Sequence, residues 1–154
     1  MKTQHFSSDA EVHALVMAFE TASLAPTEFT HSAHIAVALA YLAEAPLPVA
    51  TGRMRAALAY FTAQHGASGY HETLTLFWMR LLDHVAQARY ATLPLWARIN
   101  AAVERYGSMA PVWAHYSRDR LFGGTAREEW VAPDLAPLPF GKPTGNESTT
   151  EGTT

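Results

Sequence analysis

Apolar residues recur at helical spacing along most of the chain, and this pattern predicts five main helices. The first begins at Ser8, where Ser8 and Glu11 form a capping box, and the second begins after Thr30, which can act as an N-cap. The expected helices cover residues 8–24, 30–45, 48–66, 70–87 and 92–106. No stretch alternates between apolar and polar residues as a strand would. The sequence therefore predicts an all-α, single-domain helical bundle.

The C-terminal third of the chain has a different character. Gly107, Pro111 and the aromatic segment 112–116 predict a short helical piece after the fifth helix. Beyond Pro133 the chain is rich in Pro, Gly, Ser and Thr, and residues 141–154 carry too little apolar surface to offset the entropy of ordering them. We therefore expect a bundle domain over residues 1–139 and a disordered tail over residues 140–154.

Composition and charge exclude several classes of protein. The chain has 154 residues, of which 49% are hydrophobic and 16% charged, as is typical of one globular domain. Its formal net charge is −3 and it has no Lys/Arg run, which argues against a nucleic-acid partner. No long uncharged apolar stretch predicts a membrane span or a signal peptide, so we expect a cytoplasmic protein. The absence of cysteine excludes disulfides and thiolate chemistry. The sequence leaves open whether the protein forms a homo-oligomer.

Eight histidines are a high count, and the pattern brings four of them together. His31 and His34 stand three positions apart and point roughly inward, and His71 lies near the centre of the apolar face of the fourth helix. Short connections make successive helices antiparallel, so these three should lie at one end of the bundle. The chain returns to that end at His115. The remaining histidines, at positions 5, 13, 65 and 84, have ordinary surface or helix-end explanations.

Imidazoles beside a carboxylate suit a first-row divalent metal such as Fe, Zn, Mn or Cu, because these ions take nitrogen and oxygen ligands without sulfur. The expected ligands are His31, His34, His71 and His115. Glu72 is expected to be either a ligand or the general base, and His71 and Tyr116 are the other expected catalytic groups. The alternative is that these histidines, which stand at helix starts, are satisfied by backbone carbonyls and tyrosine hydroxyls.

Aromatic and cationic residues surround the expected cluster. Phe29, Tyr70, Trp78 and Trp113 are expected to line a small-molecule pocket, although such residues more often belong to the core. Arg118 and Arg120 could bind a carboxylate or phosphate at its rim, unless Asp119 neutralises them.

Three functions fit this pattern. The leading one is a small metal-dependent enzyme that acts on a small, aromatic or carboxylated molecule by oxygenation, lyase chemistry or hydrolysis. The second is a metal-free lyase or isomerase in which a histidine and Glu72 form an acid–base pair. The third is a non-enzymatic module that binds a small ligand. No organic cofactor is indicated.

Several strings are similar to those of a known family. They are Glu28-Phe-Thr-His-Ser-Ala-His34, Gly69-Tyr-His-Glu-Thr-Leu-Thr75, His115-Tyr-Ser-Arg-Asp-Arg-Leu-Phe122 and Pro133-Asp-Leu-Ala-Pro-Leu-Pro139. They resemble a family of short, uncharacterised, all-helical bacterial proteins, and the likeness spans most of residues 26–139. The resemblance implies no particular activity, but three of the strings contain the histidines that helix geometry selects.

Overall fold

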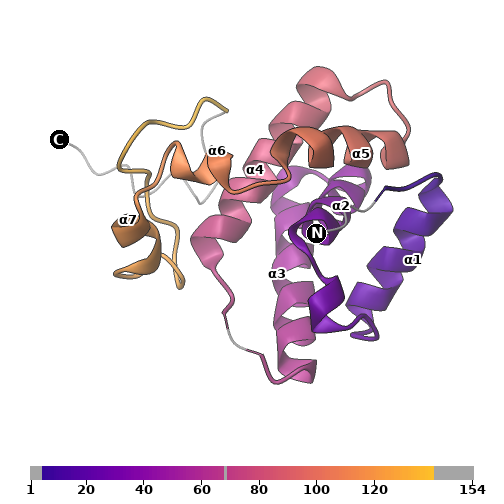
Figure 1. The fold of residues 1–154 in the computed structure, drawn as a ribbon, viewed down its shortest axis with the longest axis horizontal. Helices are drawn as coiled ribbons and strands as arrows, with labels where there is room; N and C mark the ends of the chain where they lie inside the picture. Colours follow the sequence, from indigo (N-terminus) through magenta and orange to yellow (C-terminus); the bar gives the residue numbers. More distant parts are fainter. Residues whose placement is uncertain (1–4, 68, 141–154) are drawn as a thin grey trace.

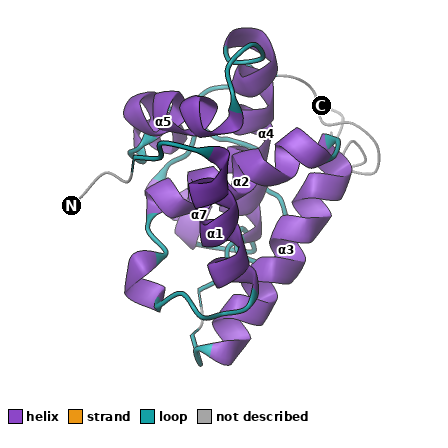
Figure 2. Cartoon of the chain, turned by 90° about the vertical axis from the view of Figure 1, so that its right-hand side faces the viewer, coloured by secondary structure: helices purple, strands orange, loops and turns teal. Residues whose placement is uncertain are grey.

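The chain forms an all-α fold, as the apolar periodicity predicts. The structure is a computed structural model that describes residues 5–67 and 69–140, and it contains no strand within these ranges (Figures 1 and 2). The five main helices are α1 (Asp9–Glu20), α2 (His31–Glu44), α3 (Leu47–Gln64), α4 (Glu72–Arg89) and α5 (Leu95–Tyr106). A single 3-10 turn, η1 (Pro26–Glu28), joins α1 to α2. None of the described helices is both long and apolar enough to cross a membrane.

Most helix ends agree with the sequence signals. The Ser8 hydroxyl accepts a hydrogen bond from the Glu11 backbone N–H, and the Thr30 hydroxyl accepts one from that of Ala33, so both predicted N-caps are confirmed. The predicted starts of the third, fourth and fifth helices differ from the observed ones by one, two and three residues, respectively. The fourth helix begins at Glu72, with His71 as its N-cap. The third helix begins at Leu47 and the fifth at Leu95, each directly after a proline N-cap. Proline favours such positions because it has no N–H that a helix would leave unpaired.

Helix α2 is the centre of the bundle. It packs against α1, α3, α4 and α5, and every residue from Ile35 to Tyr41 is buried. Four buried alanines in α2 allow neighbouring backbones to approach closely, while its larger side chains fill the spaces between helices. Only the two ends of this helix carry less buried side chains, and His31 and His34 lie in its first turn.

The C-terminal segment forms a second, smaller layer on α4. It contains α6 (Ala110–Trp113), α7 (Arg118–Phe122) and an extended stretch to residue 140, which lie on the side of the molecule opposite α1 in Figure 1. Its apolar side chains pack with Phe77, Trp78 and Leu81 of α4 in a separate core cluster. Phe140 is buried in that cluster, so the folded part includes residue 140, and the rest of the predicted tail lies outside the described residues.

The same segment caps the start of α4. The backbone N–H groups of Glu72 and Thr73 donate to the carbonyls of Arg127 and Ala126, at 2.9 and 3.1 Å. The Thr73 hydroxyl donates to the carbonyl of Glu129 and accepts from the N–H of Val131. The first N–H groups of a helix have no partner within the helix, so these bonds replace the missing partners and hold the segment in place.

Replacing Thr73 by valine should loosen the C-terminal segment. Thr73→Val keeps the side-chain size but removes both hydroxyl hydrogen bonds, so we expect the free energy of unfolding to fall by about 1–3 kcal/mol. Urea denaturation measures this loss, and limited proteolysis should detect faster cleavage after residue 122. Thr51→Val is the matched control. Thr51 is equally buried, but its hydroxyl bonds only the carbonyl of Leu47 in its own helix. Equal losses in the two variants would contradict the prediction.

Candidate functional site

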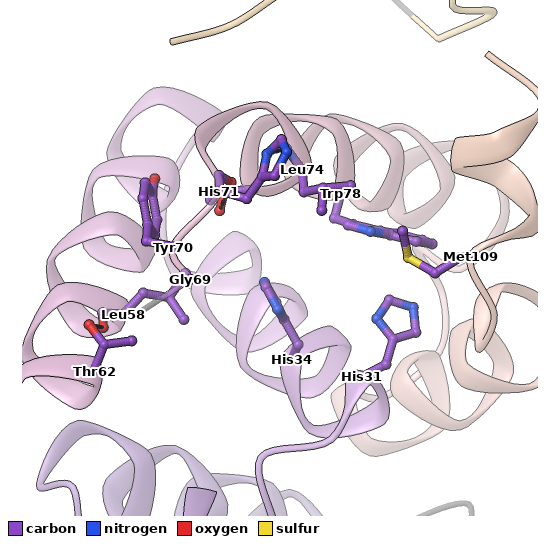
Figure 3. Close-up of a pocket in the computed structure, with 11 residues that line it drawn as sticks. His31, His34, Leu58, Thr62, Gly69, Tyr70, His71, Leu74, Trp78 and Met109 are labelled. Atoms are coloured by element: carbon purple, nitrogen blue, oxygen red, sulfur yellow. Dashed lines mark hydrogen bonds between the residues drawn. The ribbon is translucent and has the colours of Figure 1, made fainter. Parts of the chain in front are cut away.

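A cavity of about 300 Å³ lies where α2, α3 and α4 meet. Figure 3 shows His31 and His34 projecting from α2 toward α4, with Tyr70 and Trp78 on the other side of the same space. The three histidines that the sequence placed at one end of the bundle all line this cavity. Its lining consists of His31, His34, Leu58, Thr62, Gly69, Tyr70, His71, Leu74, Thr75, Trp78 and Met109.

His31 is held by one backbone group. Its Nε2 lies 3.1 Å from the carbonyl oxygen of Tyr106, at the end of α5. A carbonyl can only accept, so Nε2 carries the hydrogen, and in the neutral ring Nδ1 is left as an acceptor. Burial lowers the pKa of His31, which favours this neutral form. The ring also meets the edge of Trp78, with ring centroids 4.5 Å apart.

His34 is the least satisfied polar side chain of the cavity. Its Nε2 is buried and has no hydrogen-bond partner among residues 5–67 and 69–140. Burial, followed by the effect of nearby His31, lowers the pKa of His34 from 6.5 to about 4. The ring is therefore neutral at pH 7. Buried polar atoms are rarely left without a partner, so this nitrogen needs an explanation.

His71 differs from the other two histidines because both of its ring nitrogens are used. Nε2 donates to the carbonyl of Leu121 at 2.7 Å, and Nδ1 accepts from the N–H of Leu74 at 3.2 Å. His71 is thus the N-cap of α4 and also binds the C-terminal segment. Burial lowers its pKa, in agreement with a neutral ring. His71 therefore fits the alternative explanation, in which a histidine at a helix start is satisfied by backbone groups. It has no free nitrogen for a metal or for a proton transfer.

Glu72 does not line the cavity. Its Oε1 accepts from Arg55 Nε at 2.7 Å, and its Oε2 accepts from the Tyr70 hydroxyl at 2.7 Å. Burial, together with this bond, raises the pKa of Tyr70 to about 12, so the hydroxyl remains protonated and continues to donate. Both carboxylate oxygens are therefore engaged in joining α3 to the start of α4. The arrangement gives Glu72 a structural task, and its expected catalytic role stays a prediction.

His115 and Tyr116 lie in the C-terminal layer and do not reach the cavity. His115 Nδ1 bonds the carbonyl of Ala136 at 3.0 Å, and the Tyr116 hydroxyl donates to the carbonyl of Val131 at 2.7 Å. Burial raises the pKa of Tyr116, so its hydroxyl is a weak acid that would not readily give up its proton in a reaction. The expectation that the chain returns to the cavity at these residues is wrong, because they pack around Phe77 on a different face of α4.

The other expected ligand-binding residues divide into two groups. Tyr70 and Trp78 line the cavity as predicted. Phe29 lies one layer behind it, stacked on His34 with ring centroids 5.6 Å apart. Trp113, Arg118 and Arg120 are not in the lining.

Both arginines have partners in the C-terminal segment. The guanidinium of Arg118 lies over the ring of Trp113, 4.9 Å from its centroid. Arg120 Nε donates to the carbonyl of Ala132 at 2.9 Å. Neither arginine is placed to bind the carboxylate or phosphate of a ligand in the cavity.

Several lining residues were not identified from the sequence. Leu58 and Thr62 are four positions apart on α3, which places them on one face, and this spacing could have indicated Thr62. Met109 lies between α5 and α6 and reaches the cavity only because the chain folds back there. No local pattern identifies such a residue.

The side chains at the cavity fit the expected metal centre poorly. Within the described part of the chain, no three His, Asp or Glu side chains are grouped as a metal ion would need. Of the four expected ligands, only His31 and His34 line the cavity with a ring nitrogen free of hydrogen bonds. These two could supply nitrogen ligands, but Glu72 and His71 are already engaged and His115 is elsewhere.

Comparisons with protein-family models, with curated proteins and with solved structures find no match to this chain. The resemblance to a family of short bacterial proteins therefore stays a prediction.

The lowered pKa of His34 should make the protein less stable in acid. In the unfolded chain His34 takes up a proton at about pH 6.5, whereas in the folded protein it does so only at about pH 4. Between these values the unfolded state holds more protons, so the free energy of unfolding falls as the pH falls. The contribution of His34 is at most about 3 kcal/mol.

Chemical denaturation at a series of pH values tests this prediction. His34→Gln should lose less stability than the wild type between neutral pH and about pH 4. His13→Gln, which changes an exposed histidine of α1, is the control and should follow the wild type. Parallel curves for the wild type and His34→Gln would show that His34 does not titrate as described.

Proposed function

We propose that this protein binds a small organic molecule in the cavity between α2, α3 and α4. The observation that carries the proposal is the unpartnered Nε2 of His34, a buried polar atom in the first turn of the central helix. Leaving such an atom without a partner costs about 1–3 kcal/mol, and a bound ligand would offset that cost.

The shape and lining of the cavity support the same proposal. A volume of about 300 Å³ lies at the lower end of the range for small-molecule sites. Trp78, Leu58 and Leu74 provide apolar walls, and the imidazoles provide a few polar groups. This combination is typical of ligand pockets. At neutral pH neither imidazole is in the protonated form that a general acid needs, and the lowered pKa makes each a weak base, so binding has more support than acid–base catalysis.

Filling the cavity should abolish ligand binding. Leu74→Trp places an indole in the lining, so small molecules that bind the wild type should no longer bind. Ligand-observed NMR with a fragment library measures this loss. Leu135→Trp is the matched control, because Leu135 is 59% exposed and lies outside the cavity. Fragments that bind both variants as well as they bind the wild type would refute the proposal, as would a library without a single hit.

The metal-dependent enzyme predicted from the sequence is supported only by the imidazoles of His31 and His34. A substitution of His71 tests it. We expect His71→Ala to leave the metal content of protein purified without a histidine tag unchanged, because both His71 nitrogens bond backbone groups. Elemental analysis of the wild type, His34→Ala and His71→Ala measures this. Stoichiometric metal that disappears in His71→Ala would contradict the described role of His71 and restore the metal hypothesis.

A further inference from the structure

The cavity offers no charge to a ligand. None of its eleven lining residues is Lys, Arg, Asp or Glu. Glu72, whose carboxylate accepts from the lining residue Tyr70, forms an ion pair with Arg55 at 2.5 Å, so the two charges offset each other. A carboxylate or an ammonium group in this cavity would lose its hydration without gaining a counter-charge, which is strongly unfavourable.

The polar groups of the cavity favour a ligand that donates a hydrogen bond. The carbonyl of Tyr106 fixes the hydrogen of His31 on Nε2, so Nδ1 can only accept. No hydrogen bond within the described residues uses this Nδ1. His34, whose Nε2 has no partner, can present either a donor or an acceptor, because nothing fixes its hydrogen. These groups therefore favour a ligand with one N–H or O–H donor.

The walls favour a largely apolar body. Trp78 is held in place by its edge contact with His31, and Leu58, Leu74 and Met109 complete an apolar lining. His71, with both nitrogens bonded to the backbone, adds ring surface but no free polar atom. The hydroxyls of Thr62 and Thr75, which also line the cavity, already donate to backbone carbonyls, so a hydrocarbon or aromatic body would leave neither of them without a partner.

We propose that the cavity takes an uncharged, largely apolar molecule with a single N–H or O–H donor, as in a phenol, and discriminates against carboxylates. This inference rests on the proposed binding function. It also replaces the expectation of a carboxylated ligand, because Arg118 and Arg120 lie away from the cavity and bond within the C-terminal segment.

Three probes of similar size test the proposal on the full chain at pH 7. 4-Methylphenol is uncharged and carries a donor, 4-methylanisole is uncharged without a donor, and 4-methylbenzoate is anionic. Titrations followed by two-dimensional ¹H–¹⁵N NMR give the Kd of each probe. We expect 4-methylphenol to bind about tenfold more tightly than the ether, which is the effect of one hydrogen bond, and the carboxylate to bind more weakly still.

A variant identifies the acceptor. His31→Phe removes Nδ1, so the Kd of 4-methylphenol should rise about tenfold while that of 4-methylanisole stays unchanged. His13→Phe, on the exposed face of α1, should leave both values as in the wild type. A general loss of structure in His31→Phe would weaken the binding of both probes, which differs from the expected result. In that case the Kd values of the three probes for the wild type decide whether the cavity prefers an uncharged donor.

The outcomes separate this inference from the proposed function. Equal binding of the three probes at the cavity would overturn the ligand chemistry and leave the binding function intact. The meaning would be the same if none of the three probes bound while library fragments bound the wild type but not Leu74→Trp. Failure of the probes together with an empty fragment screen would overturn both.

Discussion

The structure depends on the burial of the middle of the central helix α2, from Ile35 to Tyr41. Four helices pack around it, and its alanines let them approach closely enough to leave little space between them. A helix enclosed in this way has no polar face, so any polar side chain on it needs a partner from another element. His31 and His34 lie in its first turn, where the packing of α2 against α3 and α4 leaves a cavity. The site therefore results from the way the first turn of α2 packs against its neighbours.

The three cavity histidines differ in what holds them, and this difference decides what each can do. His71 bonds two backbone groups, one on each nitrogen, and thereby joins the start of α4 to α7. His31 bonds one backbone carbonyl and keeps one acceptor. His34 Nε2 bonds none of the described residues. Free hydrogen-bonding capacity thus increases from His71 to His34, and the proposed ligand site follows from that order.

The C-terminal segment explains why two of the expected site residues are absent from the cavity. Its carbonyls accept from the first N–H groups of α4, and its apolar side chains pack with Phe77, Trp78 and Leu81 of α4 in a cluster separate from the main core. His115 and Tyr116 are committed to this layer by hydrogen bonds to Ala136 and Val131. The segment supports the cavity indirectly, because Leu121 fixes the ring of His71.

Patterns in the sequence predicted the helices and the gathering of His31, His34 and His71. Periodicity and capping are local properties, and short connections constrain which helix ends meet. Three features became apparent only in the folded chain: Glu72 pairs with Arg55, His71 is satisfied by backbone groups, and Met109 reaches the cavity. Each of these depends on contacts between residues distant in the chain. Such contacts depend on the exact placement of packed elements, which residue spacing alone does not specify.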